Sequence, residues 1–208
     1  MAGYCTGGTY TSVDIFVVIL VFHVCGQLSN LRQQLQNLCP KNDYEFKIKL
    51  AQIVRKHDSL NRFVNTIEKE FNGMLLLQML GCSIQLCVTC FQTTLVLKDG
   101  NTMVFIQMFF YGFYLIYILL QIYLYCYIGE KLISESIGIV DAVYECQWYH
   151  FSPNESKSLM FIMLRARIPL HITAGKFCSF SHKLFGNILR TSMSYLSMLH
   201  AMNVVNAE

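Results

Sequence analysis

Apolar residues in this chain are gathered into long runs. Residues 103–128 contain no charged side chain, and as a helix rising about 1.5 Å per residue this run exceeds the roughly 30 Å hydrocarbon core of a bilayer. Residues 74–97 form a second charge-free run, which also exceeds the roughly 20 residues that a crossing requires. Residues 9–27 and 177–203 are apolar runs that contain charged residues and histidines. The pattern predicts about four transmembrane helices over these four ranges.

The segments between the crossings have a helical periodicity with interspersed charges. Residues 28–73 begin with a continuation of the first helix, which Pro40 ends, and residues 129–176 contain a break near Ser152-Pro153. Apolar residues recur there at helical spacing, as in Leu28, Leu31, Leu35 and Leu38. We expect both segments to form amphipathic helices outside the membrane, so the predicted fold class is an all-α polytopic membrane protein.

Composition supports a membrane protein. Apolar residues make up 54% of the chain and charged residues 14%, against about 25% charged in a soluble domain. The formal net charge of +3 is small and dispersed, which argues against a nucleic-acid partner. The charge-free crossings contain no His, Asp or Glu pair for acid–base or metal chemistry, so an enzyme is not expected.

The distribution of basic residues predicts an orientation. Eight Lys and Arg residues lie between the first two crossings, whereas Lys98 is the one basic residue between the second and third. Five more basic residues lie between the third and fourth crossings, and Lys183 lies near the start of the fourth. By the positive-inside rule both long connections are cytoplasmic, and both termini of this chain lie outside.

The nine cysteines do not predict a metal site. Cys87 and Cys90 have CxxC spacing, but they lie inside a charge-free crossing, where small packing groups are the favoured interpretation. No cofactor is expected.

Residues 129–200 contain a set of distinctive motifs. They begin with Gly129-Glu130-Lys131, then Ala142, Tyr144, Trp148 and Tyr149, and then the string from Leu170 to Phe177, LHITAGKF. They continue through Phe185, Ile188, Leu189, Arg190, Thr191, Ser194 and Tyr195. In these motifs the chain resembles the insect odorant receptor family.

The resemblance implies the last four helices of a seven-helix fold, with the cytoplasmic helices forming an anchor domain. It implies a subunit of a ligand-gated nonselective cation channel, assembled with an odorant receptor co-receptor and binding small volatile odorants. We therefore expect a multi-pass protein, in contact with membrane lipid, in the plasma membrane of olfactory sensory neurons. The chain would be the C-terminal half of such a receptor.

Candidate sites follow from these expectations. An apolar, aromatic wall suits a small volatile ligand, and candidate residues for the odorant pocket are Phe16, Phe105, Phe109, Phe110 and Phe113. Asn187, Thr191, Ser194 and Ser197 recur at three- and four-residue spacing, which places four polar side chains on one helical face as a candidate pore lining. The family resemblance implies an apolar gate near the outer end of this helix, and by position Leu196, Met198 and Leu199 are the candidates for it.

Other interpretations stay open at this point. An aromatic stripe also suits helix packing or an interfacial belt, and small hydroxyls also pack helices together within membranes. Among functions, the alternatives are a seven-helix chemoreceptor that signals through G proteins and a truncated, non-conducting half-receptor.

Overall fold

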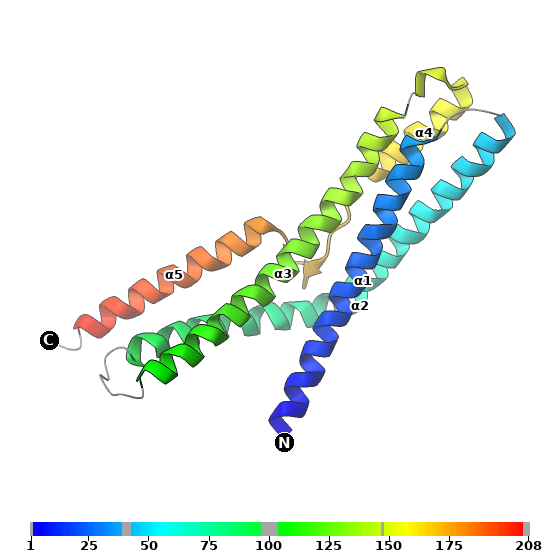
Figure 1. Ribbon diagram of the computed structural model, residues 1–208. Coiled ribbons are helices and arrows are strands. Elements are labelled where there is room, and N and C mark those ends of the chain that lie inside the picture. The colour runs from blue at the N-terminus through cyan, green and yellow to red at the C-terminus, as the bar shows by residue number, and fades with distance from the viewer. Residues whose placement is uncertain (1, 39–42, 97–103, 147, 206–208) are drawn as a thin grey trace. The chain divides into compact units, whose positions relative to one another are not determined.

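The computed structural model describes residues 2–38, 43–96, 104–146 and 148–205. Five α-helices follow one another in the order α1 (Ala2–Gln36), α2 (Asp43–Val96), α3 (Val104–Glu145), α4 (Pro153–Ala166) and α5 (His182–Val205). A short 3-10 helix (Trp148–His150) precedes α4, and the strands β1 (Thr173–Ala174) and β2 (Cys178–Ser179) precede α5 (Figure 1). The predicted all-α class is therefore confirmed for the described residues, apart from this two-stranded hairpin.

The chain divides into two compact units. The first unit comprises Met1–Glu70 and Ile128–Ile172, and the second comprises Phe71–Tyr127 and Thr173–Glu208. Both α2 and α3 run without interruption from one unit into the other. The sequence predicts a change from charged to charge-free residues near residue 73, and back to charged residues near residue 128. The helices α2 and α3 do not end at these positions.

The first unit has a dense aliphatic core. From α1, a stripe at helical spacing is exposed by 1% or less: Val17, Val21, Val24, Leu28, Leu31 and Leu35. Leu132, Ile139 and Ala142 from the second half of α3 are fully buried, and Leu159 and Ile162 of α4 join them. Because 3.6 residues make one helical turn, this spacing turns one face of each helix inward. The helical continuation predicted at Leu28 to Leu38 is confirmed as far as Gln36, where α1 ends, and Leu38 beyond it is buried.

The break predicted near Ser152-Pro153 is also confirmed. Ser152 is the N-cap of α4 and Pro153 occupies its first turn, where the missing N–H of proline costs no hydrogen bond. The Glu155 carboxylate accepts a hydrogen bond from the Ser152 backbone N–H at 3.0 Å. This contact satisfies one of the backbone donors that a helix leaves unpaired at its start.

The second unit is built from the later part of α2, the first half of α3, the hairpin and α5 (Figure 1). Leu75, Met79, Cys82 and Leu86 of α2 are buried, as are Ile118 and Ile122 of α3. The outward faces remain apolar, with Leu77 exposed by 73%, Ile84 by 64% and Ile116 by 60%. The buried core is thus narrow, and large apolar side chains cover the outside.

Three helices are long and apolar enough to cross a membrane within the described residues: Thr11–Gln36, Tyr44–Thr93 and Phe105–Glu145. These contain the first three predicted crossings, except for residues 9, 10, 94–97, 103 and 104. α5 is not among them, and Lys183 and Arg190 lie within it. It begins at His182, five residues after the predicted start at 177, because the hairpin occupies the residues before it. A fourth crossing by α5 therefore stays a prediction.

Candidate functional site

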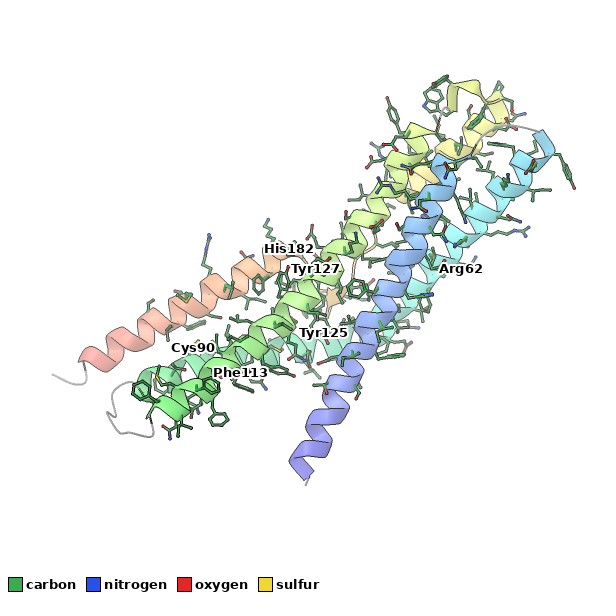
Figure 2. All side chains as sticks on the ribbon, in the orientation of Figure 1. Arg62, Cys90, Phe113, Tyr125, Tyr127 and His182 are labelled. Atoms are coloured by element: carbon green, nitrogen blue, oxygen red, sulfur yellow. The ribbon has the colours of Figure 1, made fainter. Side chains whose placement is uncertain are left out.

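The aromatic residues predicted for an odorant pocket lie along the first half of α3. Phe105 is exposed by 84%, and Phe109, Phe110 and Phe113 by 65–67%. The Phe109 ring lies 5.5 Å from that of Phe113 and 6.4 Å from that of Phe110. These side chains form an outward aromatic ridge, with Phe113 marked in Figure 2. The ridge can supply one wall of an apolar pocket or face lipid.

Phe16, the fifth residue predicted for that pocket, lies in α1 and is exposed by 53%. It belongs to the first unit, whereas the phenylalanines of α3 belong to the second. Neither unit by itself contains the complete set. The pocket that would join them stays a prediction.

The four residues predicted to line a pore share one exposed face of α5. Asn187, Thr191, Ser194 and Ser197 are all exposed. The Thr191 hydroxyl donates to the Asn187 carbonyl oxygen, and the Ser197 hydroxyl to the Ser194 carbonyl oxygen, each at 2.8 Å. These bonds leave the hydroxyl lone pairs available to water. The stripe is therefore an exposed polar surface in which the Thr191 and Ser197 hydroxyls donate within the helix.

The opposite face of α5 is the packed one. Phe185, Leu189, Ser192 and Leu196 are half-buried there, and the Ser192 hydroxyl donates to the Ile188 carbonyl oxygen at 2.8 Å. At 100° per residue these positions lie on the far side of the helix from Asn187 and Ser194. Helix packing therefore uses that side, which leaves the polar stripe unpartnered within the unit.

The three residues predicted for a gate do not share a face. Met198 is exposed by 61% and lies four residues after Ser194, in line with the polar stripe. Leu196 is half-buried on the packed side. The Leu199 side chain lies outside the described side chains. Of the three, Met198 is the one that the described structure places beside the stripe.

The N-terminal end of α5, from here on called its base, contains an aromatic cluster that sequence reasoning missed. The Tyr123 ring of α3 lies 5.6 Å from Phe185 and 6.1 Å from His182, and Tyr127 lies 6.4 Å from His182 (Figure 2). Tyr123 and Tyr127 are one helical turn apart, which is the signal that could have indicated a shared face.

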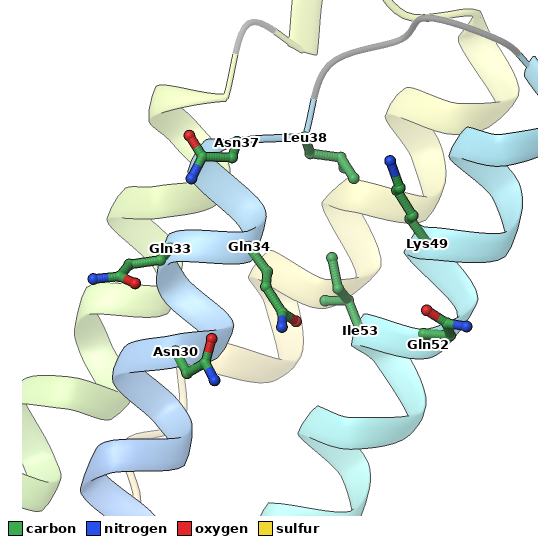
Figure 3. A pocket seen from close by; sticks show the side chains of 8 residues that line it. All are labelled: Asn30, Gln33, Gln34, Asn37, Leu38, Lys49, Gln52 and Ile53. Atoms are coloured by element: carbon green, nitrogen blue, oxygen red, sulfur yellow. The ribbon is translucent and has the colours of Figure 1, made fainter.

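Among the described residues, the first unit contains cavities that the sequence did not predict. One, of about 470 Å³, is lined mainly by carboxamides from α1 and α2 (Figure 3): Asn30, Gln33, Gln34, Asn37, Gln52, Lys49, Leu38 and Ile53. Another, of about 280 Å³, lies where α3 ends and α4 begins and has Trp148, Tyr144, Met160 and Met163 in its wall.

Cys87 and Cys90 carry free thiols and lie in α2. Within the described part of the chain, no three His, Cys, Asp or Glu side chains form a group that could hold a metal ion.

Long apolar helices with outward apolar faces define a helical membrane protein. The 7tm Odorant receptor family matches residues 1–193, so the chain belongs to the odorant receptor family. The resemblance inferred from residues 129–200 is thereby confirmed, and it places the chain among receptors.

Individual relatives agree with this assignment. The chain is 29% identical to Odorant receptor 13a of Drosophila melanogaster, with 97% of this chain and 51% of the relative covered. It is 29% identical to the Odorant receptor coreceptor of Aedes aegypti, over 70% of this chain and 30% of that protein. The chain thus spans about half the length of Odorant receptor 13a.

A solved structure has the same fold. The insect olfactory receptor OR5 from Machilis hrabei, in complex with eugenol, matches with a TM-score of 0.81 at 18% identity, covering 92% of this chain and 48% of that one. The polytopic helical membrane fold is therefore confirmed.

Proposed function

We propose that this chain is part of an odorant receptor subunit of a ligand-gated, nonselective cation channel, in which α5 lines the pore. The exposed polar stripe of Asn187, Thr191, Ser194 and Ser197 is the observation that carries the proposal. A water-filled pathway requires polar groups on one face of a helix whose other face is packed, and α5 has this arrangement. Met198, beside the stripe, would contribute an apolar constriction that closes by expelling water.

We propose that small volatile odorants bind within the membrane against the aromatic ridge of α3. Leaving water and contacting aromatic faces both favour the binding of an apolar ligand. The exposed Phe109–Phe113 pair offers such a surface. The match to an insect olfactory receptor determined in complex with eugenol supports an odorant of this general kind. Phe16 would join the ridge if α1 lines the same pocket.

We propose that the partner is an odorant receptor co-receptor, in the plasma membrane of olfactory sensory neurons. The similarity to the Aedes aegypti coreceptor supports a common subunit architecture. The chain would supply the last four of seven crossings, with segments 28–73 and 129–176 in the cytoplasm as the anchor and both of its termini outside. A glycan at Asn154, within the sequon Asn154-Glu155-Ser156, would contradict this orientation.

The channel proposal is tested by recording currents from membrane patches. The complete reading frame of the native transcript is expressed with the co-receptor, and inside-out patches are bathed in solution without GTP. We expect odorant-evoked, nonselective cation currents to persist in these patches. Currents that need GTP would instead favour signalling through G proteins, and odorant binding without any current would favour a non-conducting receptor.

The pore assignment is tested by thiol modification of α5. In Ser194→Cys, a positively charged thiol reagent should reach the polar stripe and block most of the odorant-evoked current. Ser192→Cys is the matched control, because Ser192 lies two residues away on the packed face. The unmodified receptor, treated in the same way, accounts for the cysteines already present, which include the nine of this chain. Equal block of Ser192→Cys and Ser194→Cys would contradict a pore along the polar stripe.

A further inference from the structure

The hairpin before α5 contains a turn with two consecutive residues in the left-handed region. Strands β1 and β2 pair antiparallel, with Ala174 opposite Cys178, and the Phe177 N–H donates to the Ala174 carbonyl oxygen at 3.1 Å. Within this turn Gly175 has φ of 59° and Lys176 has φ of 64°. Side chains disfavour this left-handed region, and glycine adopts it without steric cost.

Gly175 also approaches α2 closely. Its backbone N–H donates to the Asn72 carbonyl oxygen at 3.0 Å. A Cβ atom at position 175 would lie 2.6 Å from Leu76 Cδ2 and 3.1 Å from Leu76 Cγ. Asn72 and Leu76 are one helical turn apart on α2, so the hairpin turn contacts a single site on that helix. A Cβ atom at this position would therefore require the Leu76 side chain to shift.

The other side of the hairpin is fixed to α3. Phe180, which follows β2, is exposed by 2%, and its ring lies 5.6 Å from Tyr125. The first turn of α5 continues this contact, since Phe185 lies 5.6 Å from Tyr123. The Leu184 N–H donates to the Ser181 hydroxyl oxygen at 3.3 Å, which caps the helix start. No more than six residues separate Gly175 from that cap.

The base of α5 therefore has two attachments, one to α2 through Gly175 and one to α3 through Phe180 and Phe185. A change in the spacing of α2 and α3 must displace the base of α5 or break one of these contacts, because close-packed contacts rearrange rather than stretch. We infer that Gly175 is a positioning residue for gating, which holds the base of α5 on α2 so that movement of α2 and α3 reaches the pore helix. This inference rests on the proposed function.

The test uses variants that separate turn conformation from contact with α2. Asparagine tolerates the left-handed region, so Gly175→Asn preserves the turn but brings a Cβ against Leu76. Leu76→Ala removes the Cδ2 and Cγ atoms that it would meet. Lys176→Gly is the matched control at the neighbouring left-handed position, since the Lys176 side chain is exposed.

Each variant is expressed as the complete reading frame with the co-receptor and compared at equal surface level. We expect Gly175→Asn to shift the half-activating odorant concentration, or the current without odorant, by about fivefold or more. Unitary conductance should not change. Adding Leu76→Ala to Gly175→Asn should reverse much of the shift. Lys176→Gly should leave both quantities unaltered. An unshifted Gly175→Asn receptor, or a shift that Leu76→Ala does not reduce, would overturn the inference.

Thermal unfolding of the purified receptor distinguishes this inference from the proposed function. If the unmodified receptor gives no current, the channel proposal fails, and the melting temperatures of the same variants then decide whether the contact exists. Non-additive changes for Gly175→Asn and Leu76→Ala would support the contact between hairpin and α2. Additive changes would overturn it.

Discussion

The two halves of α3, one in each unit, differ in how far their large apolar side chains are exposed. Its first half exposes Phe105 by 84% and Ile116 by 60%, whereas its second half buries Leu132 and Ile139 completely. The first unit also has ion pairs on its surface, such as Lys49 with Glu45 at 2.7 Å. Burying apolar groups and exposing charges is stable in water, whereas an exposed apolar face is stable against lipid. The difference supports the proposal that the first half of α3 faces lipid.

The largest effect that sharpens this comparison is expected from truncating one leucine in each half of α3. Leu132→Ala removes a fully buried side chain and should lower stability by about 2–5 kcal/mol, through lost contacts and a cavity. Leu120, exposed by 58%, would face lipid that refills the vacated space, so Leu120→Ala should cost less than about 1 kcal/mol. Thermal unfolding of the receptor in lipid nanodiscs measures both. Equal losses would contradict the comparison.

A smaller effect is expected at the start of α4. Glu155→Ala removes the carboxylate that accepts from the Ser152 N–H and should cost about 0.5–2 kcal/mol, as the loss of a helix cap does. The exposed Ser158 on the same helix provides the control variant Ser158→Ala, with little change expected. The same unfolding assay distinguishes them, and an unchanged melting temperature for Glu155→Ala would show that the cap is not important.

The smallest effect concerns pH. His57 is buried in the first unit, and burial, with Arg165 nearby, lowers its pKa below the ordinary 6.5, although Asp58 opposes this. The folded chain thus keeps His57 neutral where the unfolded chain takes up a proton. The stability that depends on neutral His57 is present above pH 6.5 and is lost as pH falls toward the lowered pKa. The melting temperature should fall less between pH 7.5 and pH 5.5 in His57→Gln than in the unmodified receptor. Identical decreases in the two proteins would contradict the assignment.

The sequence predicts the long apolar helical segments of α2 and α3, because long charge-free runs are typical of membrane helices. It also predicts the buried stripe from Leu28 to Leu38, since helical periodicity is local. It does not show that α3 continues as one helix beyond its charge-free run, because charges change a helix's surroundings without ending it. The hairpin is missed because each of its strands has only two residues, too few for an alternating pattern.

The candidate sites show the same limits. The spacing of Asn187, Thr191, Ser194 and Ser197 predicts their shared face, and all four are exposed together. The gate candidates were chosen by distance along α5, and this choice groups Leu196 with Met198 although the two lie on different sides. The contact of Gly175 with Leu76 joins residues about a hundred positions apart, which no local pattern encodes.

Placing a lysine in each half of α3 tests most directly where the helix meets lipid. Ile116 lies near the middle of the charge-free run, and Ile137 lies in the first unit, with exposures of 60% and 44%. Ile116→Lys should cost about 3 kcal/mol for a charge at the centre of a membrane helix, which would sharply reduce the fraction of protein that resists alkaline extraction from membranes. Ile137→Lys should leave that fraction unchanged. Equal fractions for the two variants would contradict a lipid-facing first half of α3.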